Sequence, residues 1–262
     1  MSYSFASIYD KIYSLQARRY AQLLYEIIEK YYPSTRYILD LGCGTLLIEA
    51  NLPKKFKFVG IDASSFMLKE AKKKKLKNVV LIKSDIRKFK LRKSFDVVIS
   101  LNDTINHLLS LREIRKVFKN VKKVLKSNGL FVFDINTEES LRYYLPKKLS
   151  NWIVFSDEGR KEVLVYRKFK ERKFLIWEIY YFTNNGTIKK EIIRERVYNI
   201  KEIKHTLLRE GFNILEELLL KKGKVLIVSV FKLNWKKFHK ELLNYVGEIM
   251  RTLYNTEMVQ KT

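Results

Sequence analysis

Apolar residues in the first half of the chain follow two alternating patterns, one typical of helices and one of buried strands. Residues 14–31 repeat large apolar side chains every three or four positions, which predicts an amphipathic helix that ends at Pro33. Later helices are predicted over 46–52, 64–75 and 111–125, the last of them terminated by Ser127, Asn128 and Gly129. Short, continuous apolar runs predict strands over 37–41, 56–61, 79–82, 95–101 and 130–135. This alternation predicts an α/β fold: a Rossmann-like, doubly wound, mostly parallel sheet covered on both faces.

The pattern changes between residues 146 and 199, where extended runs follow one another without helical spacing. Asn184, Asn185 and Gly186 lie between two of these runs and indicate a hairpin turn, so an antiparallel β-meander is expected after the fifth strand. A helix over 200–210 and strands over 213–220 and 225–231 then bring the main sheet to seven strands. The predicted division is a main domain of residues 1–145 and 200–232, a meander insert of residues 146–199 and a C-terminal helix within 233–262, about 235–254.

Composition narrows the class of protein. An apolar fraction of 47% and an aromatic fraction of 13% favour a folded globule. The longest apolar runs are far too short to cross a bilayer, and the N-terminus has no secretion signal. The single cysteine, Cys43, excludes an internal disulfide and a cysteine-rich zinc site, and we predict no metal site. The default expectation is a cytoplasmic protein without a membrane partner.

The charge of the chain is strongly positive. Its 53 Lys and Arg residues exceed its 28 Asp and Glu residues, which gives a net charge of +25 and favours polyanionic partners such as RNA. The lysine runs at 69–78 and 122–129 lie at predicted helix ends, however, where cations offset the helix dipole. No arginine-rich tail or RNA-binding signature accompanies the charge. RNA is therefore kept as the alternative partner.

Candidate chemistry gathers at the carboxyl ends of the predicted strands, where open parallel sheets bind ligands. The first strand ends in Asp40 and is followed by Gly42 and Gly44, and the second ends in Asp62. Glycines let the backbone approach a ligand closely, and an acidic residue about twenty positions further on can accept both hydroxyls of a ribose. This combination indicates a cofactor that contains adenosine. Because Asp40 would repel a pyrophosphate, the acidic residues favour S-adenosylmethionine (SAM), which carries a sulfonium and an ammonium group, over a dinucleotide.

Five segments resemble the class I SAM-dependent methyltransferases in order and spacing: ILDLGCGT, FVGIDASSFMLKEAKKK, VVLIKSDIRKF, FDVVISLNDTINHL and LKSNGLFVFDINT. Within that class the chain is similar to small-molecule methyltransferases such as the nucleotide-sugar N-methyltransferases, which also share the early FASIYDKIY segment and the position of the meander. The resemblance covers roughly residues 5–232. Relatives usually continue GCGTG, whereas Leu46 directly follows Thr45 here, so we interpret the stretch as a SAM loop shortened by one residue.

The resemblance implies a role for individual residues. Tyr9 would contact the methionine carboxylate or the sulfonium, or else would anchor the N-terminal segment. The other implied cofactor contacts are Gly42 and Gly44 at the methionine part, Asp40 at its amino group, Asp62 at the ribose, Asp85 and Ile86 at the adenine, and Leu101 and Asn102 on the methyl-donor side.

Methyl transfer from a sulfonium is an in-line displacement, so the protein has to align the acceptor and exclude water. A general base is needed only if the acceptor must first lose a proton. His107, Asn102 and Asp103 form the candidate catalytic set, although a buried or helix-capping histidine is the simpler explanation of His107. His205 and His239 are expected to be structural. Meander residues that could line an acceptor pocket are Tyr166, Trp177 and Tyr180.

Two absences from the sequence disfavour known types of nucleic-acid methylation. The fourth strand is not followed by an Asn-Pro-Pro-Tyr tetrad, the motif that holds a flipped base. The chain also has no cysteine besides Cys43 that could act as a nucleophile. We therefore predict a SAM-dependent methyltransferase that acts on N or O of a small molecule, with the meander as the acceptor cap. The alternatives are a tRNA or rRNA methyltransferase and a methyltransferase-like binding protein that has lost catalysis.

Overall fold

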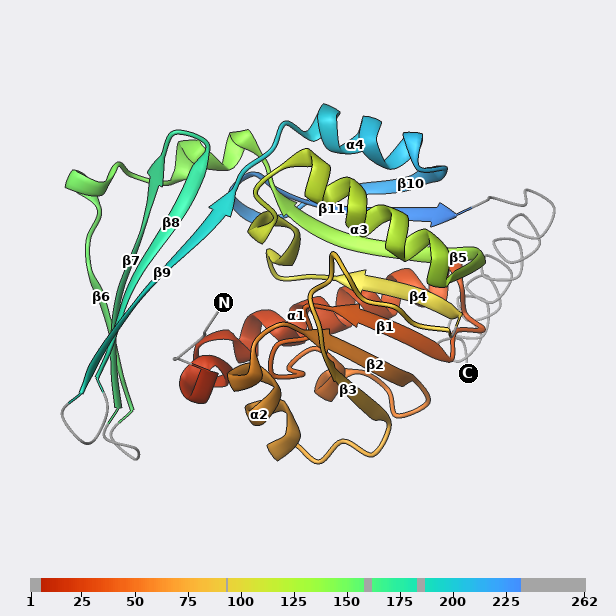
Figure 1. Ribbon diagram of the computed structural model, residues 1–262, viewed down its shortest axis with the longest axis horizontal. Coiled ribbons are helices and arrows are strands. Elements are labelled where there is room, and N and C mark those ends of the chain that lie inside the picture. Colours follow the sequence, from red (N-terminus) through yellow and green to blue (C-terminus); the bar gives the residue numbers. More distant parts are fainter. Residues whose placement is uncertain (1–5, 93, 158–161, 183–186, 232–262) are drawn as a thin grey trace, which may run out of the picture.

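The structure, a computed structural model, describes residues 6–92, 94–157, 162–182 and 187–231 (Figure 1). Its main sheet has the strand order β10-β11-β5-β4-β1-β2-β3, and every neighbouring pair is parallel except those that include β11. The strands are β1 (Tyr37–Leu41), β2 (Lys57–Asp62), β3 (Val79–Lys83), β4 (Phe95–Ser100), β5 (Leu125–Asn136), β10 (Phe212–Leu219) and β11 (Lys224–Phe231). The predicted seven-stranded, mostly parallel α/β sheet is thus confirmed.

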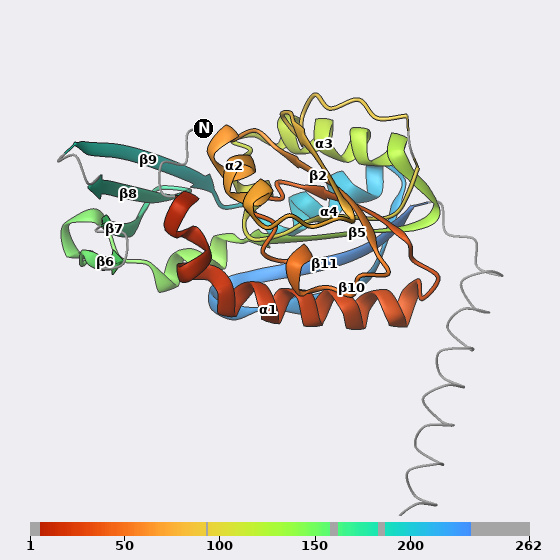
Figure 2. The same cartoon turned by 90° about the horizontal axis from the view of Figure 1, so that it is seen from below.

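Helices cover both faces of this sheet (Figure 2). The helices are α1 (Ala6–Tyr31), α2 (Ser65–Lys73), α3 (Leu111–Val124) and α4 (Ile200–Arg209). Neighbouring residues of the central strands point to opposite faces: Val97 and Ile99 of β4 pack with α1, whereas Val98 packs with α3 and α4. Such two-sided burial explains why these strands are continuous apolar runs in the sequence.

A second, antiparallel sheet stands beyond the carboxyl ends of β4 and β5 (Figure 1). Its strands are β6 (Ile153–Asp157), β7 (Glu162–Glu171), β8 (Phe174–Phe182) and β9 (Ile188–Arg196), in that spatial order. The 3-10 turns η3 (Glu138–Tyr143) and η4 (Lys147–Leu149) lead into it from β5. The meander predicted after the fifth strand is therefore present. The predicted hairpin turn at residues 184–186 and the helix expected over 235–254 fall outside the described residues.

The first helix starts eight residues earlier than its periodicity predicts, at Ala6 instead of residue 14. Its additional two turns pack on the meander, where buried Ala6 contacts a cluster that includes Leu164, Ile179 and Ile193. The apolar partners of this segment lie in the meander and at Met67 of α2, so the sequence alone does not show what the first two turns pack against. Helix α1 therefore bridges the two sheets (Figure 2).

Two other predicted helix boundaries are wrong. The helix expected over 46–52 is reduced to a single 3-10 turn, η1 (Glu49–Asn51). Helix α3 ends at Val124, and β5 begins at the next residue, so that Asn128 and Gly129 lie within the strand instead of terminating the helix. A Cβ on Gly129 would lie 2.9 Å from the carbonyl oxygen of Asp96, so this glycine serves a close strand-to-strand approach.

Candidate active site

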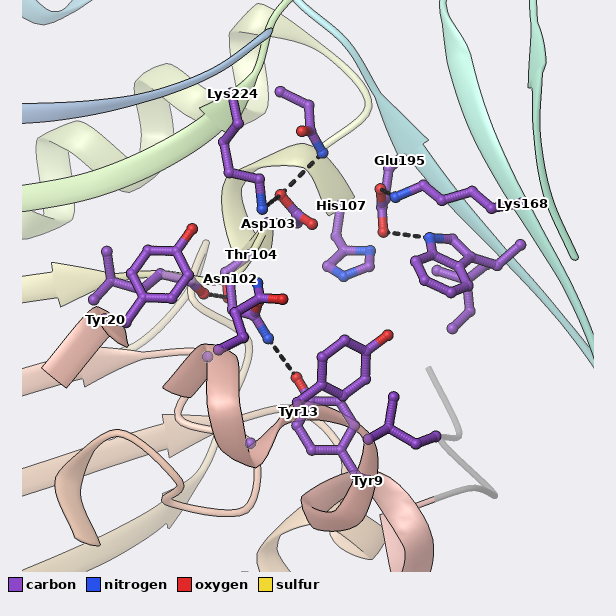
Figure 3. A pocket seen from close by; sticks show the side chains of 18 of the residues that line it. Tyr9, Tyr13, Tyr20, Asn102, Asp103, Thr104, His107, Lys168, Glu195 and Lys224 are labelled. Carbon is purple, nitrogen blue, oxygen red and sulfur yellow. Dashed lines mark hydrogen bonds and ion pairs between the residues drawn. The ribbon is translucent and has the colours of Figure 1, made fainter. Parts of the chain in front are cut away.

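A pocket of about 1070 Å³ opens at the carboxyl ends of the parallel strands, between these ends, α1 and the meander (Figure 3). The order of the strands reverses between β1 and β4, and ligands of open α/β sheets bind at such a point. Single-ligand pockets occupy about 300–1,000 Å³, so this pocket has room for a cofactor and an acceptor together. We call its two sides the strand-end half (Gly42, Gly44, Asp62, Asp85, Ile86 and Leu101) and the meander half (Tyr166, Lys168, Trp177, Ile193 and Glu195).

The two glycines after β1 line the strand-end half, and each has a different reason to lack a side chain. Gly44 has φ +53, and a Cβ built on it would meet no atom within 4 Å, so it borders open space in the pocket. Gly42 has φ +89, and a Cβ on it would lie 2.5 Å from Thr104 Oγ1. Gly42 thus permits close packing of two loops, and Gly44 leaves room for a ligand.

Leu46 takes the backbone conformation that a third glycine would have. Its φ of 63° follows left-handed Gly42 and Gly44 at the same two-residue spacing. The loop therefore has a leucine in a left-handed conformation at this point, and the interpretation of a loop shortened by one residue stays a prediction. A left-handed non-glycine residue costs about 1–2 kcal/mol, and burial of a leucine side chain stabilises by about 1.5–3 kcal/mol. Leu46 is 2% exposed and packs against Cys43, Leu68 and Ala71, which offsets the strain.

Asp62 at the end of β2 is held by backbone amides on both of its carboxylate oxygens. The N–H of Gly44 donates to Oδ2 at 2.9 Å, and the N–H of Ser64 donates to Oδ1 at 2.7 Å. Burial raises the pKa of Asp62, while these two N–H groups oppose the rise. A carboxylate accepts about four hydrogen bonds, so each oxygen keeps capacity for a ligand hydroxyl at the pocket wall.

Asp40 does not line the pocket. It is 3% exposed and lies beside Glu49, which is equally buried. Within the described residues, Asp40 Oδ1 and both Glu49 oxygens lack a hydrogen-bond partner. Burial raises the pKa of both carboxyls, and the neighbouring Glu49 raises the pKa of Asp40 further. The two groups are therefore best described as a pair that retains a proton beneath the glycine loop, without direct access to a ligand.

Asp85 and Ile86, the residues predicted to contact the adenine, lie in the strand-end half. Arg87 holds the Asp85 carboxylate from two nitrogens, with Nε 2.9 Å from Oδ1 and Nη2 2.5 Å from Oδ2, and also pairs with Glu113. The Arg87 hydrogen bonds lower the pKa of Asp85. This pairing leaves Asp85 a charged, fixed wall of the pocket, with apolar Ile86 beside it.

Tyr9 lies in the pocket and also anchors the N-terminal helix, so its two alternative roles are compatible. Asn102 Nδ2 donates to the Tyr9 hydroxyl oxygen at 2.6 Å, and Gln16 Nε2 donates to Asn102 Oδ1 at 2.6 Å (Figure 3). Burial raises the pKa of Tyr9 well above its usual value. Leu101, 3% exposed, lines the pocket beside this contact. The loop after β4 is thus fastened to α1.

Asp103 and His107 stand between the two halves. Asp103 Oδ1 accepts hydrogen bonds from Lys224 at 2.5 Å and from Asn136 Nδ2 at 2.9 Å. Burial favours the neutral acid, but Lys224 outweighs it and lowers the pKa of Asp103. His107 ends the 3-10 turn η2 (Thr104–His107), with its ring directed into the pocket (Figure 3).

Of the other histidines and aromatic residues considered in the sequence, some line the pocket and others do not. His205 is exposed on α4 and does not line the pocket, and His239 lies outside the described residues. Tyr166 and Trp177 line the pocket as predicted, whereas Tyr180 does not line it and packs against Trp152 with its ring tilted.

A buried ion pair in the meander half escaped prediction. Lys168 Nζ donates to Glu195 Oε2 at 2.8 Å, and Trp177 Nε1 donates to Glu195 Oε1 at 2.7 Å. Lys224, likewise unpredicted, comes from β11 at the far end of the chain. The available signal in the sequence was a charged residue within a predicted strand. This signal does not identify the residue with which the charge pairs. Among the described residues no group of three or more His, Cys, Asp or Glu side chains could hold a metal ion, and no helix has the length and apolar character that a membrane span requires.

This strand order, with a glycine loop after the first strand and a carboxylate at the end of the second, defines a Rossmann-like nucleotide-binding enzyme that favours SAM. Residues 34–253 match a family model described as "Methyltransferase domain", and the chain belongs to this family. It is a SAM-dependent methyltransferase. Its own features fit SAM: Gly44 borders open space, and Asp62 presents a fixed carboxylate to it.

Similar proteins cover most of the chain. An uncharacterized protein of Methanocaldococcus jannaschii, MJ1252, is 29% identical over 95% of this chain and 88% of its own length. A SAM-dependent methyltransferase from Clostridium acetobutylicum has a similar structure, with a TM-score of 0.70, 24% identity, and coverage of 87% of this chain and 97% of its own. The sugar N-methyltransferase KedS8 from Streptoalloteichus has a TM-score of 0.70 at 22% identity, covering 81% of this chain and 87% of its own. These structural likenesses support the fold.

Proposed function

We propose that this methyltransferase transfers the methyl group of SAM to a nitrogen of a small-molecule acceptor. The observation that carries the proposal is the single pocket of about 1070 Å³, in which the glycine loop and the polar wall of the meander face the same space. A pocket of this size, closed on one side by α1, suits a compact acceptor. The sugar N-methyltransferase KedS8 has a similar fold, which supports an amine as the acceptor group.

The strand-end half would hold the cofactor. Asp62 would accept the ribose hydroxyls, Asp85 and Ile86 would face the adenine, and Gly42, Gly44, Leu101 and Tyr9 would surround the methionine part. When bound there, SAM supplies an electrophilic methyl group on a positively charged sulfur. The aromatic ring of Tyr9 suits such a cation.

The meander half would orient the acceptor. A neutral amine attacks through its lone pair, so it needs alignment more than deprotonation. Asp103 stays ionised because Lys224 lowers its pKa, and it can accept a hydrogen bond from the acceptor N–H. His107, directed into the same space, and Asn102 complete the proposed polar contacts.

The test uses methyl-labelled SAM and a cell extract separated into an ultrafiltrate of small molecules and an RNA fraction. Wild type is compared with an Asp62→Ala variant, which should lack the cofactor contact. The expected result is label in the ultrafiltrate that resists both mild alkali, which hydrolyses methyl esters, and hot hydriodic acid, which cleaves methyl ethers. Label released by either treatment would exclude nitrogen as the acceptor atom.

RNA methylation is the second candidate, and one observation favours it. Arg19, Lys221 and Lys222 are exposed residues that line the pocket, and the chain carries a net charge of +25. An anionic small molecule would use the same cations. Label confined to the RNA fraction would replace the small-molecule proposal with this one.

A further inference from the structure

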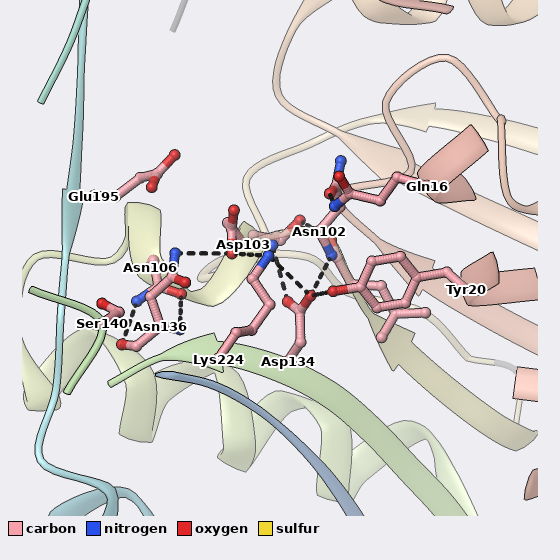
Figure 4. Close-up of polar contacts among 12 residues, drawn as sticks. Gln16, Tyr20, Asn102, Asp103, Asn106, Asp134, Asn136, Ser140, Glu195 and Lys224 are labelled. Atoms are coloured by element: carbon pink, nitrogen blue, oxygen red, sulfur yellow. Dashed lines mark hydrogen bonds and ion pairs between the residues drawn. The ribbon is translucent and has the colours of Figure 1, made fainter. Parts of the chain in front are cut away.

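A fully buried carboxylate lies directly beneath the loop that joins the two halves of the pocket (Figure 4). Asp134, near the end of β5, is 0% exposed and is not a lining residue of the pocket. Its oxygens receive hydrogen bonds from two consecutive backbone N–H groups: Asn102 donates to Oδ2 at 3.0 Å, and Asp103 donates to Oδ1 at 2.9 Å. The Tyr20 hydroxyl of α1 also donates to Oδ2.

The loop that Asp134 binds has an unfavourable backbone conformation. Asn102 and Asp103 have φ values of 61° and 69°, so two consecutive residues with side chains are left-handed. Asn and Asp tolerate this region better than most residues, but each still needs local compensation. Consecutive backbone N–H groups that point the same way form a concave anion site, and here the anion is the protein's own carboxylate.

The turn sends its two side chains in opposite directions. Asn102 points toward α1, where it bonds with Tyr9 and Gln16 (Figure 4). Asp103 points toward β11, where it pairs with Lys224. The geometry of this one turn therefore sets a contact on the cofactor side and a contact on the acceptor side.

Lys224 completes the arrangement by bridging both carboxylates. Its Nζ lies 2.5 Å from Asp103 Oδ1 and 3.6 Å from Asp134 Oδ2. Burial opposes the charge of Lys224, but the two carboxylates raise its pKa well above the usual value, so it stays protonated. The negative charge of Asp134 is thereby neutralised without withdrawing either oxygen from the backbone amides.

We propose that Asp134, neutralised by Lys224, is a positioning residue: it holds the left-handed Asn102–Asp103 turn and so fixes the side chains that face SAM and the acceptor. It acts through the turn and contacts neither ligand. The inference rests on the proposed roles of Asn102 and Asp103. The substitution Asp134→Asn tests it, because an amide keeps the size of the side chain but turns an NH₂ group toward one of the two backbone N–H groups.

The opposite end of the sheet provides a matched control. Asp96, at the start of β4, is 4% exposed and accepts hydrogen bonds from the backbone N–H groups of Arg36 at 3.0 Å and Tyr37 at 2.8 Å. Lys126 pairs with it at 2.7 Å. Asp96 thus also has two backbone N–H donors and a lysine partner, but both N–H groups bind its Oδ2, Lys126 is 42% exposed, and Asp96 lies away from the pocket. Asp96→Asn should cost stability without changing ligand binding.

The experiment measures SAM affinity by calorimetry and thermal stability without SAM for wild type, Asp134→Asn and Asp96→Asn. Both variants should lose thermal stability, and Asp134→Asn more, because the two N–H donors of Asp134 bind different oxygens and its lysine partner is more buried. SAM affinity should fall about tenfold in Asp134→Asn and stay within about twofold of wild type in Asp96→Asn. Equal SAM affinity in Asp134→Asn and wild type, or an equal loss in both variants, would overturn the proposal. These outcomes do not depend on the acceptor, so they are separate from the test of small-molecule methylation.

A second set of variants covers the case in which Asp134→Asn alone prevents folding. D134N/K224M and D103N/K224M each remove Lys224 and one of its two carboxylate partners, and D96N/K126M is the control at the other end of the sheet. The proposal expects weaker SAM binding in D134N/K224M than in D103N/K224M and D96N/K126M. Wild-type SAM affinity in D134N/K224M would overturn it.

Discussion

The strand-end half of the pocket is made by residues within a few positions of the ends of four neighbouring strands, whereas the meander half is made by side chains that pair across a second sheet. Asp62 is held in the strand-end half by the backbone N–H groups of Gly44 and Ser64. In the meander half, Lys168 and Glu195 meet across two strands of a different sheet. The strand-end half is thus held by hydrogen bonds to the backbone, and the meander half by pairing between side chains of different strands.

This difference indicates how proteins with one fold can bind the same cofactor and differ in their acceptors. Backbone amides that hold Asp62 do not depend on the side chains of the meander. The Lys168–Glu195 pair, by contrast, is a contact between side chains and involves no backbone group at a strand end. The four predictions that follow test this separation, from the largest expected effect to the smallest.

The substitution Lys168→Met should give the largest loss of stability. It leaves Glu195, whose side chain is 5% exposed, without its cation, and an uncompensated buried charge costs about 3–5 kcal/mol. Denaturant unfolding measures the change. The double variant K168M/E195Q should recover most of the loss, because it removes the charge as well. A double variant as unstable as the single one would mean that packing, not charge, is the cause.

The substitution Asp62→Ala should have the largest effect on the cofactor. It leaves the N–H groups of Gly44 and Ser64 without an acceptor and removes the proposed ribose contact. The ribose would lose two hydrogen bonds to the charged Asp62 carboxylate, at about 1.5 kcal/mol each. This loss predicts about a hundredfold weaker SAM binding by calorimetry. Glu195→Gln is the control and should keep SAM affinity within about twofold. Equal losses in the two variants would show that the halves are not independent.

Two neighbouring glycines should respond differently to alanine. Gly42→Ala places a Cβ against Thr104 and should lower the free energy of unfolding by about 2 kcal/mol even without SAM. Gly44→Ala should cost about 1 kcal/mol, because its Cβ meets no atom, but it should weaken SAM binding by intruding on the pocket. Thermal unfolding with and without SAM separates the two effects. Unchanged SAM affinity in Gly44→Ala would remove Gly44 from the cofactor contact.

The smallest effect is expected from the charged wall at Asp85. Arg87 lowers the pKa of Asp85 in the folded state, so the pair adds stability above the unfolded pKa of about 3.9, and this stability is lost as the pH falls through the folded pKa. Asp85 is 30% exposed on its side chain, so solvent screening limits the gain to less than about 1 kcal/mol. Arg87→Gln should therefore be less stable than wild type at pH 7, with a smaller difference at pH 2–3 in urea unfolding. Arg112→Gln, at an exposed position on α3, should show neither change.

The sequence predicted those parts of the site that depend on neighbours in the chain. Continuous apolar runs gave the central strands, because both faces of β4 and β5 are buried. Gly42, Gly44 and Asp62 belong to one local pattern, and the pocket brings them together. Asp40 followed the same pattern, but its burial beside Glu49 depends on how the loop folds back.

The parts that could not be predicted depend on distant partners or on compensated strain. The start of α1 requires the meander as its packing partner. Asp134 and Lys224 lie ninety positions apart, and no motif links them. The left-handed backbone of Leu46 could not be predicted from its residue type. Leucine avoids that region unless burial of its side chain compensates the strain.

Leu46 also couples the glycine loop to α2 as a unit of local unfolding. Its side chain is shared with Cys43 of the loop and with Leu68 and Ala71 of α2, so the loop cannot open without exposing that cluster. Amide protons at the end of α2, around Ala71, should then exchange with solvent at the rate of loop opening. A ligand that closes the loop would slow this exchange at positions that it never contacts, and hydrogen exchange on α2 would report cofactor occupancy without any knowledge of the acceptor.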